Sequence, residues 1–388
     1  MKRSRAATCI ALAAALLAAA TLTARGDEPG VSEDAILFGQ AAALEGPSSV
    51  LGQRMRHGIV AAFTEINAKG GIHGRKLQLI SRDDGYDPDR SVVQTLRLIE
   101  DDKVFALIGA VGTATAMATI PITNARDVPF IGPVSGAELL RDLELTNVVN
   151  IRPSYGAEAE TLIKHLTEDR HFTRIAIFYQ DDSFGRDGLT GVKNALAKRG
   201  LELAAEGTFE RNTRAVGAAW RTIKRAEPEA IVMVGTYGPS AEFIKLAHRS
   251  GLSPTFVNIS FVGATALAKE LGPDGEGVVV AQVVPFPWDR SIKLVADYQA
   301  AQKAFDPTLT PDFVSLEGYL SGRLAAAALE NAGPNPTRAG LLRAINDIGR
   351  FDISGSIVTV GARAFGTPPK VFLTVIQKDG TFKAIDRL

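Results

Sequence analysis

The chain has 388 residues, of which 43 are Lys or Arg, 43 are Asp or Glu and 5 are His, so its formal net charge is zero. Without a basic excess, the composition gives no indication of a nucleic-acid partner or of binding to an anionic membrane surface. The length is that of two ordinary domains, and the hydrophobic share of 46% is typical of a globular protein.

The first 24 residues have the layout of an export signal. Residues 1–5 are basic, residues 6–20 form an uncharged run rich in Ala and Leu, and small residues follow up to Ala24. This order predicts a signal peptide over residues 1–24, cleaved near its end, and a mature protein in the periplasm. A membrane anchor is the alternative, but the apolar run is short for a spanning helix.

Residue types that carry metal or nucleophile chemistry are scarce. Cys9, the only cysteine, lies inside the predicted leader, so a mature chain would contain neither a disulfide nor a thiolate. The five histidines show no metal-binding spacing, and the acidic stretch 83–89 lacks the spacing and final Glu of a calcium loop. Asp87 before Pro88 is better explained as a helix N-cap. We therefore expect no metal and no cofactor.

Strands and helices alternate along the first half of the chain. The short strands are apolar and rich in branched residues, which is typical of parallel strands covered on both faces. In chain order we expect a strand at 36–42, a helix at 48–69, a strand at 76–81, a helix at 87–100, a strand at 104–108, a helix at 113–125 and a strand at 129–131.

The alternation restarts near residue 150. We expect strands at 174–179, 230–234 and 255–258, helices at 184–199, 215–226 and 241–250, then helices at 291–305, 314–331 and 338–345 and strands at 356–360 and 371–376. Such alternation predicts an α/β protein with two similar halves built on parallel-type sheets. Ligands of open α/β sheets bind at the carboxyl ends of the strands, so the loops there are candidate sites.

The segment Gly109–Thr115 is the first candidate. It follows a buried strand, contains Gly112, and precedes a helix whose free N–H groups suit a small anion such as a carboxylate. Thr113 is also a plausible N-cap, which would be a purely structural role. The segment is not a phosphate loop, because no Lys-Ser/Thr pair follows the glycines.

Three further loops follow later strands. Residues 132–136, which contain Ser135, lack the spacing of a nucleophile elbow and suit a second carboxylate contact better. Phe184 and Tyr237 stand at the tips of two loops in the second half, where we expect them to be exposed as a wall of the ligand site.

Taken in order, several short motifs give the chain a resemblance to the periplasmic solute-binding proteins of ABC importers, of the leucine/isoleucine/valine-binding type. The match spans nearly the whole mature chain, and only the set of motifs together is specific. The motifs are Phe38-Gly-Gln with Leu44-Glu-Gly-Pro47, Asn67 to Gly74, Asp83 to Pro88, Ile108-Gly109, Val128 to Pro133, Asn150-Ile-Arg152, Phe178 to Gly185 and Glu317-Gly-Tyr319.

The resemblance implies a type I periplasmic binding protein: two Rossmann-like lobes joined by three crossings, near Asn150, Val284 and Phe351. The first lobe would comprise residues 31–150 and 285–350, and the second would comprise residues 151–284 and 351–388. It further implies hinge closure around a small solute and delivery to a membrane permease. We expect a monomer, because lobe motion is easier without a large interface.

The resemblance also assigns site residues by position. Thr113, together with Val134 and Ser135, would hold the carboxylate of an amino acid. Phe184, Tyr237 and Phe313 would be aromatic walls.

The sequence departs from the family pattern at two positions. Ser260 stands where an acid normally pairs with the ligand's ammonium, and Leu51 stands where an aromatic is common. Asp182 and Glu158 are possible substitutes for the acid, since a buried ammonium without a counter-charge is costly.

The leading hypothesis is therefore capture of a small carboxylate or amide without an amine, with a branched-chain amino acid as a close alternative. A ligand sensor that reports to a membrane kinase or chemoreceptor is the second alternative. An α/β hydrolase or nucleotide-dependent enzyme is a weaker one, since the spacings of its motifs are missing.

Overall fold

The first lobe is built on a five-stranded parallel sheet. The computed structural model describes residues 28–360 and 370–388 of the chain. The strand order of this sheet is β2-β1-β3-β4-β5, with every neighbouring pair parallel. Its elements are β1 (Ala35–Ala42), α2 (Ser49–Ala68), β2 (Lys76–Asp83), α3 (Pro88–Glu100), β3 (Ala106–Ile108), α4 (Thr113–Asn124), β4 (Phe130–Ile131), the 3-10 turn η1 (Glu138–Arg141) and β5 (Val148–Val149).

The second lobe is built on a seven-stranded sheet in the order β14-β13-β10-β9-β8-β6-β7. The strands from β6 to β10 pair in parallel, whereas β13 and β14 are antiparallel additions at one edge. Its elements are α5 (Tyr155–Glu168), β6 (Ile175–Gln180), α6 (Ser183–Ala197), β7 (Ala205–Phe209), α7 (Gly217–Lys224), β8 (Ala230–Val234), α8 (Tyr237–Arg249), β9 (Thr255–Asn258), η2 (Ser260–Val262), α9 (Ala264–Leu271), η3 (Gly272–Gly275), β10 (Val279–Gln282), β13 (Phe372–Ile376) and β14 (Phe382–Ile385).

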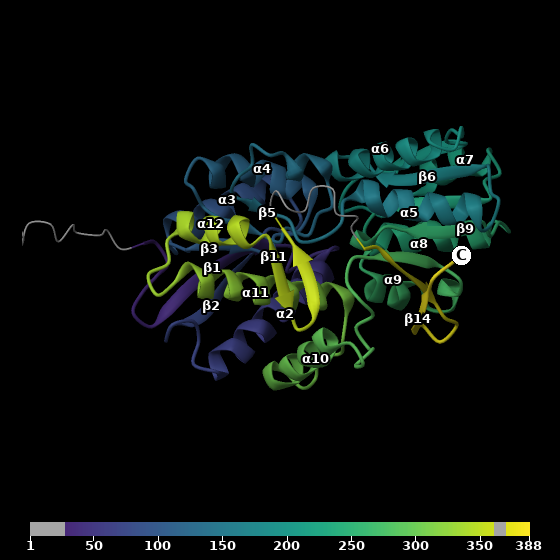
Figure 1. Ribbon diagram of the computed structural model, residues 1–388. Coiled ribbons are helices and arrows are strands. Elements are labelled where there is room, and N and C mark those ends of the chain that lie inside the picture. The colour runs from purple at the N-terminus through teal and green to yellow at the C-terminus, as the bar shows by residue number, and fades with distance from the viewer. Residues whose placement is uncertain (1–27, 361–369) are drawn as a thin grey trace, which may run out of the picture.

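After β10 the chain returns to the first lobe, as Figure 1 shows for the green and yellow-green helices. The returning elements are α10 (Lys293–Phe305), α11 (Phe313–Ala332), α12 (Arg338–Ile348), β11 (Arg350–Ile353) and β12 (Ser356–Thr359). Helix α11 packs along α2 at very short range. This is evident at Gly58, where an added Cβ would lie only 1.9 Å from the Ser315 carbonyl oxygen. A Cβ on Gly318 would lie 2.3 Å from the carbonyl oxygen of Met55. Glycine at these positions lets α11 approach the first lobe closely enough to face the junction with the second.

Two of the predicted crossings coincide with places where the chain passes from one sheet to the other. The chain changes sheets between β5 and α5, around Asn150, and again after β10, close to Val284. Phe351, placed at the third crossing, lies instead in the β11-β12 hairpin, which contacts α11, and the Ser354 hydroxyl on this hairpin donates to Asp297 of α10. Residues 351–359 thus pack with the helices of the first lobe, and the exact lobe boundaries remain a prediction.

Local signals account for most of the elements. Asp87 caps α3 by accepting from the Arg90 N–H, with Pro88 at the first helical position, as the sequence indicates. Strands β5, β7, β10, β11 and β14 are absent from the predicted elements, because they are short and β7 contains a glycine and polar residues. The predicted signal peptide, including Cys9, lies outside the described residues.

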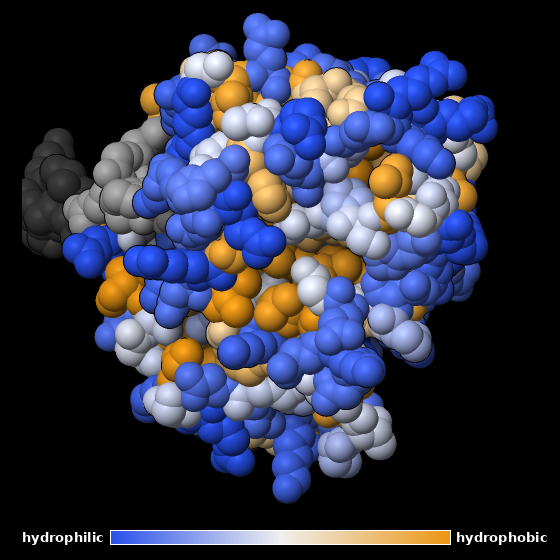
Figure 2. All heavy atoms as spheres, turned by 90° about the vertical axis from the view of Figure 1, so that its right-hand side faces the viewer, coloured by the Kyte–Doolittle hydropathy of each residue, from blue (hydrophilic) through white to orange (hydrophobic). Residues whose placement is uncertain are grey.

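The surface is mainly hydrophilic on the face shown in Figure 2, where apolar residues gather in a band near its middle. Within residues 28–360 and 370–388, no helix combines the length and apolarity needed to cross a bilayer. In the same ranges, no group of three or more His, Cys, Asp or Glu side chains is arranged to hold a metal ion.

Candidate ligand-binding site

Two buried hydroxyls mark the carboxyl ends of β3 and β4. The Thr113 and Ser135 hydroxyl oxygens are 2.7 Å apart, and both residues are fully buried. A parallel bridge between Val111 and Val134 holds the two loops together. The loops predicted to form the carboxylate site are therefore neighbours in space.

Thr113 does not act as the N-cap of α4. The capping position is Gly112, whose φ of 107° is one that glycine adopts readily, and Thr113 is the first helical residue. Within the described part of the chain, no side chain caps this helix. The first-turn N–H groups of α4 are therefore left as donors for an anion beside the Thr113 hydroxyl.

Val134 contributes its side chain rather than a backbone donor. Its N–H already donates to the Ala110 carbonyl oxygen at 2.8 Å, while its side chain lines a cavity between the lobes. Four of the predicted site residues line this same cavity: Leu51, Val134, Ser260 and Phe313. The other lining residues are Arg152, Phe261, Gln282, Val283, Val284, Val314 and Glu317.

Phe184 is buried rather than exposed at a loop tip, so that expectation is wrong. Its ring packs 5.3 Å from Tyr155 and 4.5 Å from Phe261, centroid to centroid. Phe261 in turn lies 6.0 Å from the Tyr86 ring of the first lobe. The Tyr86 and Phe261 rings thus bring the two lobes into contact here.

Tyr237 is also buried, with 5% of its surface exposed. It begins α8 in the second lobe, and its hydroxyl is within hydrogen-bonding reach of Ser49 and the Val50 backbone at the start of α2. Sequence alone gave no reason to expect that burial, because the covering residues come from the other lobe.

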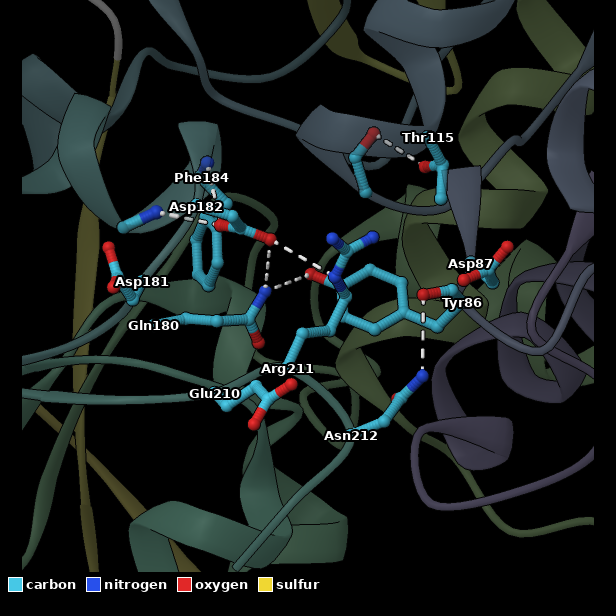
Figure 3. Close-up of polar contacts among 12 residues, drawn as sticks. Tyr86, Asp87, Thr115, Gln180, Asp181, Asp182, Phe184, Glu210, Arg211 and Asn212 are labelled. Atoms are coloured by element: carbon cyan, nitrogen blue, oxygen red, sulfur yellow. Dashed lines mark hydrogen bonds and ion pairs between the residues drawn. The ribbon is translucent and has the colours of Figure 1, made fainter. Parts of the chain in front are cut away.

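A polar network joins the lobes beside the aromatic layer (Figure 3). The Gln180 side chain donates to the Tyr86 hydroxyl at 3.2 Å and to Asp182 at 2.7 Å. Arg211 pairs with Asp182 at 3.4 Å and lies over the Tyr86 ring, 6.0 Å from its centroid. Asn212 donates to the Gly85 carbonyl oxygen at 3.1 Å. These contacts stabilise the closed arrangement of the lobes.

Asp182, one of the two proposed substitutes for the missing acid, is fully engaged. Besides Gln180 and Arg211, it accepts from the N–H groups of Phe184 and Gly185 as the N-cap of α6. Its role is therefore to begin α6 and to anchor the interlobe network.

Ser260 and Glu158 are bonded to each other. Glu158 accepts from the Ser260 N–H at 2.7 Å and from its hydroxyl at 2.9 Å, and Arg152 donates to that same hydroxyl. Position 260 lacks the expected acid, but the Glu158 carboxylate of α5 is hydrogen-bonded directly to Ser260. Burial raises the pKa of Glu158, and the charge of Arg152 opposes that rise.

Arg152 and Glu317 are site residues that sequence reasoning missed. Both are almost completely buried, and Arg152 Nε lies 3.4 Å from Glu317 Oε1. Both belong to motifs that carried the family resemblance, but nothing in those motifs assigned them to the cavity. The signal that could have found them is the presence of ionisable residues in otherwise apolar segments.

The profile of the family described as periplasmic binding protein matches residues 35–380. The chain belongs to this family. Its type I, two-lobed α/β fold is confirmed by a crystal structure titled a possible leucine/isoleucine/valine-binding protein from Rhodopirellula baltica. That periplasmic binding protein is 36% identical, with a TM-score of 0.85, over 91% of this chain and 96% of the other.

Two curated periplasmic binding proteins are more distant. The leucine-, isoleucine-, valine-, threonine- and alanine-binding protein of Pseudomonas aeruginosa is 23% identical over 78% of this chain and 80% of its own. The Leu/Ile/Val-binding protein homolog 7 of Brucella abortus is 25% identical over 64% of this chain, and the match spans 62% of the Brucella protein's length. The resemblance found in the sequence is thus confirmed, and the family is one of binding proteins.

Proposed function

We propose that this periplasmic binding protein captures a small carboxylate-bearing solute between its lobes and delivers it to the membrane permease of an ABC transporter. One observation carries the proposal: a cavity at the lobe junction is lined by side chains from both lobes and from α11. A ligand held there touches both lobes only when they are closed, so its binding favours the closed state.

The carboxylate contact is assigned to the Thr113 and Ser135 hydroxyls and to the first turn of α4. Leu51, Phe313 and Val314 provide an apolar wall that suits an aliphatic or aromatic group on the ligand. The names of the Pseudomonas and Rhodopirellula proteins make aliphatic amino acids the first candidates. The predicted signal peptide supports a periplasmic location, and a monomer is the expected state.

The proposal is tested by a thermal-shift screen of the chain without residues 1–24, against amino acids, aliphatic and aromatic carboxylates and amides. A ligand at 100 times its Kd adds about 2.7 kcal/mol to the free energy of unfolding, which raises the melting temperature by several degrees. Saturable binding of a carboxylate-bearing compound, verified by titration calorimetry, supports capture. No shift with any compound contradicts it.

Delivery to a permease needs a second measurement. Ligand uptake by cells that carry the gene and its transporter should fall when the gene is deleted. Unchanged uptake with intact ligand binding would favour the sensor alternative, and turnover of an ester or nucleotide would favour an enzyme.

A further inference from the structure

Helix α4 has an uncharged, apolar outer side. None of its residues 113–124 carries a charge, and its inner side, with Ala116 and Ile120, is buried in the first lobe. The outer side is partly or fully exposed, and Met117 is 43% exposed. A surface helix normally carries charged or polar residues there, so this side is typical of one that another molecule covers. The outer residues follow helical spacing and are all apolar: Ala114, Met117, Ala118, Pro121 and Ile122.

Helix α3 extends this apolar side. It packs along α4, and an ion pair of 2.6 Å between Glu100 and Arg126 joins the C-terminal ends of the two helices. Val93 precedes Glu100 by about two helical turns, so it lies on the same side of α3 as the contact with α4. Val93 is 46% exposed. Figure 1 shows α3 and α4 along one edge of the first lobe, with α10 on the opposite edge.

The exposed side of α3 also carries two charges without partners. Asp89, Val93 and Arg97 follow one another at intervals of one helical turn, so they form an exposed stripe along α3. The ion pairs that α3 makes within residues 28–360 and 370–388 use Arg90 and Glu100, which leaves Asp89 and Arg97 without one. This stripe and the outer side of α4 together form what we call the α3–α4 face.

A two-fold axis through Val93 makes the stripe complementary to itself. Asp89 and Arg97 lie about 6 Å from Val93 along the helix axis, in opposite directions. When two copies of α3 cross antiparallel at Val93, Asp89 of each copy faces Arg97 of the other, and the two Val93 side chains meet at the centre. A parallel crossing places like charges together instead. The order of charges along α3 therefore favours a second copy of the chain over an unrelated partner.

We propose that the α3–α4 face is the interface of a homodimer, in which two α3 helices cross antiparallel at Val93 and the apolar sides of the α4 helices pack beside them. The inference goes beyond the proposed function, and it replaces the monomer expected from the sequence. That expectation rested on freedom of lobe motion. The α3–α4 face belongs to the first lobe alone, so each second lobe remains free to move in the dimer.

Sedimentation equilibrium of the chain without residues 1–24 tests the dimer directly. We expect the average mass to rise from that of one copy to that of two as the protein concentration increases over about a hundredfold range, because association of two copies follows mass action. The mass of two copies at every concentration would equally support the dimer. The mass of one copy at every concentration overturns the inference.

Charge reversal tests the antiparallel pairing. Asp89→Arg brings two arginines together at each contact, and Arg97→Asp brings two aspartates together, so we expect either variant to weaken dimerisation at least about tenfold. An equimolar mixture of the two variants regains opposite charges at both contacts, and so does a chain that carries both substitutions. Glu202→Arg is the matched control, because Glu202 is an exposed acid on the second lobe, and it should dimerise like the wild type.

Recovery is the decisive result of this experiment. It requires residues 89 and 97 of different copies to face each other, so both the mixture and the double variant should form dimers. Absence of recovery, or an equal loss in Glu202→Arg, overturns the antiparallel pairing. Asp89 and Arg97 lie outside the lining of the cavity between the lobes, so we expect circular dichroism and solute binding to be unchanged in every variant. A monomeric wild type whose solute uptake falls on charge reversal would overturn the dimer and assign the face to the permease.

Discussion

The side-chain amide of Gln180 on the second lobe donates a hydrogen bond to the Tyr86 hydroxyl on the first, at 3.2 Å. Tyr86 is 1% exposed, and its ring lies against Gly112, where a Cβ would come within 2.5 Å of the ring. The contact that joins the lobes therefore stands directly beside the α4 N-terminus assigned to the ligand carboxylate. Closure and the proposed ligand capture therefore involve the same part of the molecule.

Replacing Tyr86 by Phe should weaken closure without disturbing the first lobe. Loss of one hydrogen bond, about 1 kcal/mol, shifts the balance between open and closed states about fivefold toward the open one. We expect a larger radius of gyration in small-angle scattering of the ligand-free protein and weaker ligand binding. Tyr179→Phe is the control, because its hydroxyl contacts Glu206 within the second lobe. Equal effects of the two variants would contradict a role for Tyr86 in closure.

Replacing Thr113 by Val removes the hydroxyl assigned to the ligand and keeps the side-chain shape. We expect the best ligand of the screening panel to bind about tenfold more weakly, since a hydrogen bond to a charged group contributes about 1.5–3 kcal/mol. Thr119→Val on the same helix is the control, because its hydroxyl bonds only to backbone oxygens of Thr115 and Ala116 among the described residues. Calorimetric affinities that fall equally in both variants would remove Thr113 from the site.

Gly58→Ala should destabilise the fold at the α2–α11 contact. The new Cβ would lie 1.9 Å from the backbone carbonyl oxygen of Ser315, so the helices must move apart, at a cost of about 1–3 kcal/mol or more. Gly217→Ala is the control, because its Cβ would meet only the end of the Arg221 side chain, at 3.6 Å. Chemical denaturation should show a clear decrease in the free energy of unfolding for Gly58→Ala and little change for Gly217→Ala. Equal stabilities would mean that the close approach of the helices is not required.

Asp84 gives the folded protein a pH-dependent stability. Burial raises the pKa of this carboxyl from 3.8 to about 6, so the folded state binds its proton more tightly than the unfolded state does. Between pH 4 and 6 the folded state therefore holds more protons, and the free energy of unfolding falls as pH rises, by up to about 3 kcal/mol from this group.

Asp84→Asn removes this dependence and serves as its test. Denaturation of both proteins at several pH values should give a stability difference that moves in favour of the variant from pH 4 to 6 and is constant above about pH 7. The other titrating groups, including Asp187, are present in both proteins. Their contributions therefore cancel in the difference between the two free energies of unfolding. A difference that does not change with pH would contradict the raised pKa.

Much of this molecule follows from local sequence. Short apolar runs rich in branched residues predicted most of the strands, and Asp87-Pro88 marked the start of α3, because these preferences depend on neighbours along the chain. The hydroxyls of Thr113 and Ser135 were also predictable, since the ends of adjacent parallel strands meet at one edge of a sheet. The order of the motifs identified the family.

The tertiary structure alone decided which buried polar and charged side chains meet. Arg152 and Ser260 are 108 residues apart in sequence, and Ser260 and Glu158 are 102 apart, so no local pattern could pair them. Glu317 reaches the cavity because α11 returns to the first lobe and packs closely on α2. Tyr237 lies against Ser49 and Val50 of the other lobe, whereas Phe184 is buried by Tyr155 and Phe261 of its own lobe. The sequence by itself determined most of the elements and the family, whereas the packing of the two lobes on each other determined which side chains meet at the candidate site.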